Sequence, residues 1–505
     1  MAIIGEIIKR AIKVNGLITP DPTPENAQHE VLLSLLSKAK NTAFGKHYRF
    51  QEIIESQNPV ETFQQQVPIF DYDKLHAEWW HYLEEGHENV TWPSGQRFFA
   101  LSSGTTSNSK AIPVTDDMVD AIRKAGIQQV LSMKNFDMPA DFFGKDIMML
   151  GSSTHLKDYH GFLAGEISGI SAANLPLWFR KFYKPGKKIA ASDTWEERVR
   201  RIAKAAPKWD VGTISGIPSW AELMLKEIIR YNKLDNIHDI WPNLQVYTTG
   251  GVAFGPYRKS FEKLLGKSMT YIDTYLASEG YLATQKRPDT DAMSLIIDNG
   301  IFFEFVPFKP ENMDDNGRVR SNATVLPLKD VTEGEEYVLL ISTVSGAWRY
   351  MIGDTVIISD KEKSEIKISG RTKHFLNVVG EQLSVHQMNQ AIQKVQDKFD
   401  IHVQEFLVST VSENGKYVSK WYLGSDQVFE SEELSRYLDS ELCNSNKNYL
   451  VARKQSLSDV LVRVIPVSHF HDWSANFKKL GGQSKIPRVM NEEDLLKFEA
   501  HIATL

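Results

Sequence analysis

Hydroxyl-bearing residues gather in one short segment, Leu101–Pro113, which reads LSSGTTSNSKAIP. The segment contains the small and hydroxylated residues Ser102, Ser103, Gly104, Thr105 and Thr106, and Lys110 follows them. Such a loop can direct hydroxyls and backbone N–H groups at an anion, with the lysine charge nearby. It is not a Walker A loop, because the second glycine and the Gly-Lys-Ser/Thr ending are missing. By itself it fits a phosphate loop and a solvated surface loop equally well.

Four later segments accompany this loop. They are VYTTGGVAF (246–254), YLASEG (275–280), WRYMIGD (348–354) and SGRTKHF (369–375). The first is a strand running into paired glycines, and in the second a tyrosine at a strand end is followed by a carboxylate four residues later. Each pattern alone is common, so the information lies in their order and separation.

These segments follow short apolar runs that are typical of buried strands. The runs are Phe98–Leu101, Ile147–Leu150, Val211–Ile214, Val246–Tyr247 and Tyr271–Tyr275, and helical patterns lie between several of them. Strands that alternate with helices predict a largely parallel sheet covered on its faces. Ligands collect at the carboxyl ends of such strands, where the small-residue loops would lie. After Pro218, helical spacing predicts one buried stripe: Trp220, Met224, Ile228 and Tyr231.

The pattern changes twice in the C-terminal half. LIIDNGIFFEFVPF contains a strand–turn–strand signal at Asn299-Gly300, which indicates an antiparallel or barrel-like addition to the large unit. Beyond residues 371–373, helix and hairpin patterns indicate a compact α+β unit. The predicted fold is therefore α/β: a large domain (1–370) of mostly parallel sheets flanked by helices with a β-barrel-like addition, and a small, mobile α+β domain (371–505).

Composition excludes several classes of protein. The 505 residues are 42% apolar and 24% charged, and 58 Lys and Arg against 64 Asp and Glu give a net charge of −6. That balance argues against nucleic-acid binding through global phosphate neutralisation. One cysteine, Cys443, excludes an intrachain disulfide framework. No apolar run reaches the roughly 18 residues of a membrane span, and residues 1–16 indicate an amphipathic helix rather than a secretory signal. We expect a cytoplasmic protein with no nucleic-acid partner, no membrane span and no evident protein partner.

The order of the five segments resembles the adenylate-forming superfamily of acyl-CoA ligases, luciferase-like enzymes and peptide-synthetase adenylation domains. Within it, the chain is most similar to the Gretchen Hagen-type acyl-acid amido synthetases known from plant auxin and jasmonate conjugation. Less generic stretches carry that likeness across most of the chain: NTAFGKHYRF (41–50), VPIFDYDKL (67–75), SGIPSW (215–220), FFEFVPF (302–308), WRYMIGDTV (348–356) and QSKIPR (483–488).

The resemblance implies ATP and Mg²⁺ as cofactors and a role for each matching residue. The stretch from Ser102 to Thr106 would contact phosphates, with support from Lys110, although Ser107 and Ser109 replace the more typical Gly and Pro. Adenine would lie beside Gly250, Gly251, Tyr275 and Ser278, and Glu279 would hold Mg²⁺ and serve catalysis. Asp354 would accept hydrogen bonds from ribose, with Arg371 close to ribose or phosphate. Lys485 matches the superfamily's late catalytic lysine.

The resemblance also implies a swivel of the small domain about Lys373. One departure stands nearby, because plant members carry a lysine where this sequence has Gln382. The reaction implied is ATP-dependent conversion of a carboxylic acid to an acyl-AMP, followed by transfer to an amine, presumed to be that of an amino acid. Two alternatives stay open: an acid–thiol ligase that makes acyl-CoA, and a nucleotide-binding regulatory protein without turnover.

Overall fold

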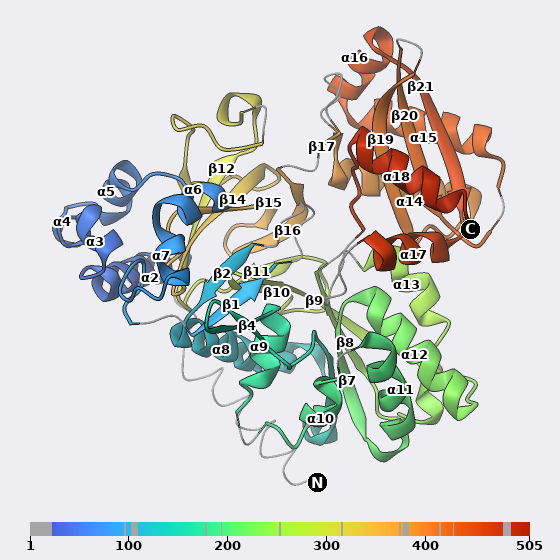
Figure 1. Cartoon of the computed structure of the whole chain (residues 1–505), viewed down its shortest axis with the longest axis horizontal. Helices are drawn as coiled ribbons and strands as arrows, with labels where there is room; N and C mark the ends of the chain where they lie inside the picture. The colour runs from blue at the N-terminus through green and yellow to red at the C-terminus, as the bar shows by residue number, and fades with distance from the viewer. Residues whose placement is uncertain are drawn as a thin grey trace. The chain divides into compact units, whose positions relative to one another are not determined.

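The computed structural model describes residues 23–94, 97–102, 110–176, 179–192, 194–251, 254–314, 317–372, 375–376, 383–413, 416–427, 429–477 and 486–505. Elements carry the labels of Figure 1. The chain divides into two compact units. The first comprises Met1–Phe254, Ser260–Ile352 and Val356–Lys367; the second comprises Gly255–Lys259, Gly353–Thr355 and Ile368–Leu505.

A mixed sheet of twelve strands runs through the described part of the first unit. In spatial order it contains β13 (Leu326–Pro327), β12 (Ile301–Pro307), β14 (Glu336–Thr343), β15 (Tyr350–Asp360), β16 (Glu365–Arg371), β11 (Met293–Leu295), β10 (Gly280–Thr284), β9 (Thr270–Ala277), β8 (Val246–Gly250), β7 (Val211–Gly216), β3 (Asp146–Leu150) and β6 (Tyr183–Lys184). The run β6–β3–β7–β8–β9 is parallel, whereas β10 pairs antiparallel with both β9 and β11. The strand-like runs ahead of the small-residue loops are thus confirmed as strands.

A second, smaller sheet carries the serine- and threonine-rich segment. Its order is β2 (Ala111–Val114), β1 (Phe98–Leu101), β5 (Phe162–Gly165) and β4 (Lys157–Tyr159). β1 and β2 are antiparallel, with Leu101 opposite Ala111, so the two strands form a hairpin. β2 is an edge strand of this sheet, so in the described part of the chain it pairs with a strand on one side alone.

Helices cover these sheets, and capping side chains or prolines mark the start of several of them. Thr115 caps the longest of them through a hydrogen bond from the N–H of Met118, and prolines open three others. The helices are α2 (Pro24–Ala39), α3 (Ala43–His47), α4 (Phe50–Glu55), α5 (Pro59–Gln66), α6 (Tyr72–Leu75), α7 (His81–Glu84), α8 (Asp116–Ser132), α9 (Ile167–Ala173), α10 (Lys187–Ala190), α11 (Trp195–Ala205), α12 (Pro218–Asn232) and α13 (Gly255–Glu262). A π-helical turn, η1 (His76–Trp80), joins α6 to α7.

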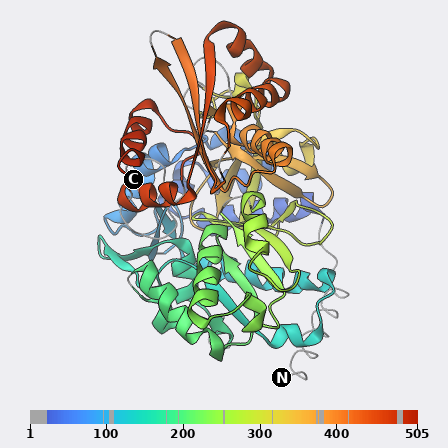
Figure 2. The same ribbon diagram turned by 90° about the vertical axis from the view of Figure 1, so that its right-hand side faces the viewer.

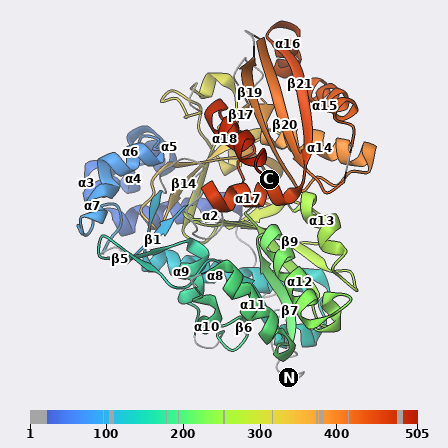
Figure 3. The same cartoon turned by 45° about the vertical axis from the view of Figure 1, so that its right-hand side comes forward.

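Two expectations need correction. In α12, which packs beside α11 (Figure 3), Met224 and Ile228 are buried, but Tyr231 is 46% exposed and Trp220 is only partly buried. The buried stripe instead takes in Ala221 and Leu225, one position along the helix from the predicted set. The strand–turn–strand signal at Asn299-Gly300 is not a hairpin either, because β14, β15 and β16 lie between β11 and β12 in the sheet.

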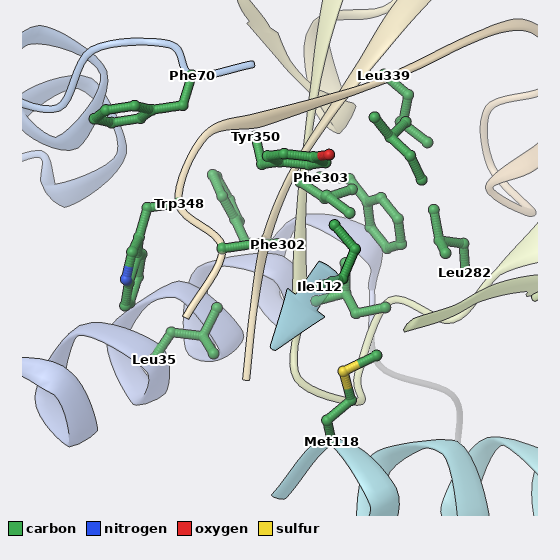
Figure 4. Close-up of a cluster of buried hydrophobic side chains, with 14 of the residues drawn as sticks. Leu35, Phe70, Ile112, Met118, Leu282, Phe302, Phe303, Leu339, Trp348 and Tyr350 are labelled. Atoms are coloured by element: carbon green, nitrogen blue, oxygen red, sulfur yellow. The ribbon is translucent and has the colours of Figure 1, made fainter. Parts of the chain in front are cut away.

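The main core of the first unit joins segments that are far apart in the sequence. Figure 4 shows Leu35 of α2, Phe70, Ile112 of β2, Met118 of α8 and Phe302 of β12 in one cluster, together with Phe303, Leu282, Leu339, Trp348 and Tyr350. These side chains are at most 2% exposed. Burial of this apolar surface holds the N-terminal helices, the small sheet and the large sheet together.

The second unit contains its own sheet between two sets of helices (Figure 2). The strands are β19 (Glu405–Glu413), β20 (Lys416–Gly424) and β21 (Leu457–Ile465); the first two pair antiparallel, the last two parallel. One face packs with α14 (Val385–Phe399), α15 (Ser431–Ser445) and α16 (Lys447–Gln455), the other with α17 (Val467–Phe477) and α18 (Glu492–Ile502). Two short strands, β17 (Phe375–Leu376) and β18 (Leu383–Ser384), complete it.

In the described part of the chain, no helix is both long enough and apolar enough to cross a membrane. The α/β fold with a large and a small unit, predicted from the sequence, is confirmed, and the large sheet is mixed rather than parallel throughout.

A buried ion pair ties α5 to the large sheet. Arg349 and Glu304 are 3% and 0% exposed, and the guanidinium Nε donates to both carboxylate oxygens at 3.1 and 3.2 Å. Nη1 of the same arginine donates to the carbonyl oxygens of Gln64 and Val67, each at 2.7 Å. Because both charged side chains are buried, the loss of either one leaves the other without its opposite charge.

Arg349→Met should therefore lower the free energy of unfolding by about 3–5 kcal/mol, measured by urea denaturation of the whole chain. Lys329→Met, which removes the exposed Lys329–Glu25 pair, should cost less than about 1 kcal/mol. The double variant Arg349→Met/Glu304→Leu should recover part of the loss. A loss as small as that of the surface pair would show that the buried pair does not anchor α5.

Candidate active site

The carboxyl end of β8 approaches β9 so closely that only glycine fits. Gly250 lies opposite Thr274, and a Cβ at that position would lie 2.7 Å from both the carbonyl oxygen and Oγ1 of Thr274. Gly251 follows with φ +83°, a conformation that favours glycine. Thr274 Oγ1 donates to the carbonyl of Thr249 at 2.9 Å and fixes this edge. The paired glycines thus leave backbone without side chains at the end of β8.

Beyond this point β9 continues to a two-residue turn that carries Ser278 and Glu279. The turn is short because Ala277 pairs directly with Gly280 of β10. Glu279 is 7% exposed and lines a small cavity with Tyr281, Asn299, Thr343 and α8. Tyr275, the residue expected beside adenine, is 6% exposed and packs in the main core. Because β8 and β9 are parallel, Ser278 and Glu279 lie beyond the carboxyl end of β8, four and five residues along the chain from Thr274.

In the β1–β2 hairpin of the small sheet, Ser102 directly follows β1 and Lys110 directly precedes β2. The N–H of Ser102 donates to the carbonyl oxygen of Lys110 at 2.9 Å and closes the hairpin. The predicted phosphate contacts Ser103, Gly104, Thr105 and Thr106 lie outside the described residues. α8 follows β2 and reaches the strand after Glu279, where Tyr281 Oη donates to Oε1 of Gln129 at 2.9 Å.

Tyr72 is a contact that the sequence reasoning missed. Its hydroxyl accepts a hydrogen bond from the N–H of Ala111 at 3.0 Å, and its ring centroid lies 5.3 Å from Nζ of Lys110. The segment VPIFDYDKL was noted as a family likeness, but nothing local indicates that its tyrosine reaches a strand 39 residues further on. Only the folded structure brings the two together.

The second unit pairs the two residues expected near ribose. Nε of Arg371, on β16, donates to Oδ1 of Asp354, on β15, at 2.6 Å. The Asp354 side chain is 15% exposed and that of Arg371 is 47% exposed. Within β15, Gly353 precedes Asp354 with φ +88°, and the carbonyl of Gly353 accepts from the N–H of Thr372 at 2.8 Å. Lys373, Gln382 and Lys485 lie outside the described residues.

The donors at this site fit a magnesium ion bound together with a nucleotide. Among the described residues, no group of three His, Cys, Asp or Glu side chains could hold a metal by itself. Protein-bound Mg²⁺ commonly uses one or two carboxylates and takes its remaining ligands from water and substrate phosphates. A single carboxylate such as Glu279 suits that mode of binding.

Comparison with known proteins identifies the family. The GH3 family N-terminal domain matches residues 21–205 and 187–270, the central domain 294–371 and the C-terminal domain 386–494. The chain belongs to the GH3 family. The match spans all three domains, so the resemblance to Gretchen Hagen-type proteins expected from the sequence is confirmed.

Individual GH3 relatives are distant. Indole-3-acetic acid-amido synthetase GH3.2 of Arabidopsis thaliana is 22% identical, and the match covers 81% of this chain and 87% of that protein. Jasmonoyl-L-amino acid synthetase JAR6 of Nicotiana attenuata is 24% identical over 51% of this chain and 46% of its own length. Among solved structures, the GH3.15 acyl acid amido synthetase has a TM-score of 0.78 at 15% identity and covers 97% of this chain and 96% of that chain. A 2-hydroxyisobutyryl-CoA ligase has a TM-score of 0.60 at 13% identity, covering 94% and 90%. At these identities the structures establish the fold of this GH3 protein.

A half-buried carboxylate on β9 gives this GH3 protein a pH-dependent stability. Burial, and secondly the charge of Asp291, raise the pKa of Asp273 to about 6. Asp273 stands opposite Thr249 of β8, one position before the Gly250–Thr274 contact. The folded state therefore keeps a proton that the unfolded chain has released, and stability falls as the pH rises from about 4 to 6.

Asp273→Asn should remove this cost. The variant should match the wild type at pH 4 and exceed it above pH 6 by about 1–3 kcal/mol, the upper value being two pKa units of 1.36 kcal/mol each. Thermal unfolding from pH 4 to 8 measures the difference. Asp235→Asn, on an exposed side chain, should show no such trend. A constant difference between Asp273→Asn and wild type across the range would rule out proton release as its cause.

Proposed function

We propose that this GH3 protein is an ATP-dependent ligase that converts a carboxylic acid to an acyl-AMP and transfers the acyl group to an amine of an amino acid. The observation that carries the proposal is the match of this chain to all three GH3 domains. The structure supports it with strand β9, which contacts Gly250 at Thr274 and leads to the turn that carries Glu279. Named GH3 relatives are amido synthetases that act on indole-3-acetic acid or form jasmonoyl–amino acid conjugates.

The residues suit the first half-reaction. A carboxylate is a poor acyl donor because its charge is delocalised and its leaving group would be oxide. An oxygen of the acid attacks the α-phosphate of ATP, the bond to the β-phosphate bridging oxygen breaks, and pyrophosphate leaves. Two anions meet in this step, so Lys110 and the hydroxyls from Ser102 to Thr106 would offset the charge on the phosphates. Mg²⁺ bound to Glu279 would supply further charge neutralisation at the phosphate oxygens.

The remaining proposed contacts position the nucleotide. The backbone of Gly250 and Gly251 would face adenine, with Tyr275 and Ser278 beside it. Asp354 would accept from ribose and Arg371 would stay near ribose or phosphate. Lys485 would assist the adenylation step, which requires the small domain, proposed as residues 371–505, to turn about Lys373 against the large domain of residues 1–370. A cytoplasmic location stays a prediction.

In the second half-reaction the unprotonated amine attacks the acyl carbon and expels AMP. The product is an amide, and the proton of the amine goes to solvent or to a base. An acid–thiol ligase shares the first half-reaction, and the fold likeness to a CoA ligase keeps it as the second candidate. The better structural match to an amido synthetase favours the amide.

The test is exchange of labelled pyrophosphate into ATP, screened across carboxylic acids, followed by AMP release with amino acids or with coenzyme A. Acid-dependent exchange with AMP release on addition of amino acids is the expected result. Release with coenzyme A alone would identify a thiol ligase. No exchange with any acid, despite ATP binding, would favour the non-catalytic alternative.

Glu279→Gln keeps the side-chain shape but removes the charge proposed to hold Mg²⁺. We expect acid-dependent exchange to fall about a hundredfold, which corresponds to about 3 kcal/mol of barrier, and the Mg²⁺ concentration at half-maximal rate to rise. The matched control is Glu365→Gln, another buried carboxylate of the large sheet, which pairs with Arg287. It should lower stability and leave the Mg²⁺ dependence unchanged. Equal Mg²⁺ dependence in both variants would remove Glu279 from the metal site.

A further inference from the structure

The β1–β2 hairpin is held from two sides at the point where its loop ends and β2 begins. β2 is an edge strand, so alternate N–H groups point away from β1 and need another partner. Ala111 is 1% exposed, which denies its N–H a bond to water. The hydroxyl of Tyr72 accepts that bond at 3.0 Å, while Lys110 is bonded to Ser102 on the other side. The Tyr72 hydroxyl therefore accepts the hydrogen bond that a carbonyl of a neighbouring strand would otherwise accept.

The same tyrosine also faces the lysine. Nζ of Lys110 lies 5.3 Å from the centroid of the Tyr72 ring, within the range in which an aromatic face attracts a cation. Hydroxyl and ring thus act on consecutive residues, Ala111 and Lys110. The two Tyr72 contacts therefore fix both the start of β2 and the position of the Lys110 charge.

Side chains from several segments fix Tyr72 in turn. Its ring stacks on His76, with centroids 5.5 Å apart, at the start of the π-helical turn η1. Nε2 of His76 lies 3.1 Å from Oε1 of Glu84, and Tyr159 Oη of β4 donates to the same oxygen at 3.1 Å. π-helical turns inside helices often occur at functional sites. The contacts make Tyr72 a preorganised support rather than a surface side chain that happens to touch the hairpin.

We propose that Tyr72 is a positioning residue for the nucleotide. Its hydroxyl sets the return strand of the phosphate-binding segment at Ala111, and its ring holds the Lys110 ammonium where the phosphates of ATP arrive. The inference rests on the proposed function, because it takes Lys110 to be a phosphate contact. It adds a residue outside the segments that the nucleotide is expected to touch.

Two variants separate the hydroxyl from the ring. Tyr72→Phe removes the acceptor for Ala111 N–H and keeps the ring; Tyr72→Leu removes both. Loss of one buried hydrogen bond predicts about a tenfold weaker ATP affinity in Tyr72→Phe, and loss of the cation–π contact about a further threefold in Tyr72→Leu. Titration calorimetry with ATP and Mg²⁺ measures the affinity without turnover. In the exchange assay the KM for ATP should rise while the KM for the acid stays constant.

Tyr337→Phe is the matched control. Its hydroxyl also accepts from a backbone N–H, that of Thr332, at 2.9 Å. The two Phe variants should lose similar thermal stability, but only Tyr72→Phe should weaken ATP binding. Hydrogen exchange without nucleotide should become faster at the Ala111 amide in Tyr72→Phe alone. Equal ATP affinity in both variants, or unchanged exchange at Ala111, would overturn the hydroxyl's role.

A double-variant comparison tests the ring. In a Lys110→Met background, Tyr72→Leu and Tyr72→Phe should bind ATP equally, because the ring acts through Lys110. A persistent threefold difference there would overturn the ring's role. ATP binding with no acid-dependent pyrophosphate exchange in the wild type would contradict the proposed function and leave the Tyr72 measurements decisive. No ATP binding by the wild type would overturn both.

Discussion

The contact between Gly250 and Thr274 is the constraint on which the candidate site depends. It lets β8 end against β9 with no side chain between them, so bare backbone is available at the strand edge. Because β9 continues from Thr274 to the turn at Ser278 and Glu279, the same register decides where the carboxylate stands. A slip of one residue that set Thr249 opposite Thr274 would place a Cβ where only glycine fits.

The proposed nucleotide contacts share a second property, which is that their charges are compensated or supported before any ligand arrives. Asp354 is paired with Arg371, and Lys110 faces an aromatic ring. A partner already in place limits the freedom that each side chain must lose on binding, but its contact has to be exchanged for one to ATP. Because the Arg371 side chain is 47% exposed, breaking its pair with Asp354 costs little free energy.

Local sequence signals predicted local structure well, and failed where partners are distant. The strands before the small-residue loops were predicted because apolar runs and small residues are adjacent in the chain. The sheet order was not: Asn299-Gly300 indicates a turn, but cannot show that three strands separate β11 from β12. Glu279 and Asp354 could be named only through a family motif, and Tyr72 not at all, since its partner Ala111 is 39 residues away. Whether a backbone N–H lacks a neighbouring strand depends on the order of the strands in the folded sheet.

That last point bears on how an edge strand could carry the segment proposed to bind phosphates. An edge leaves backbone groups unpaired, which favours access for a ligand but weakens the strand that must present it. Extending the sheet by another strand would pair those groups at the cost of covering the segment. A single tyrosine hydroxyl satisfies the buried N–H of Ala111 and covers little else. The tyrosine is itself held by His76, whose contact with Glu84 joins the helical segment α6–η1–α7 to β4 through Tyr159. The start of β2 is therefore held in place by its neighbours in the folded chain.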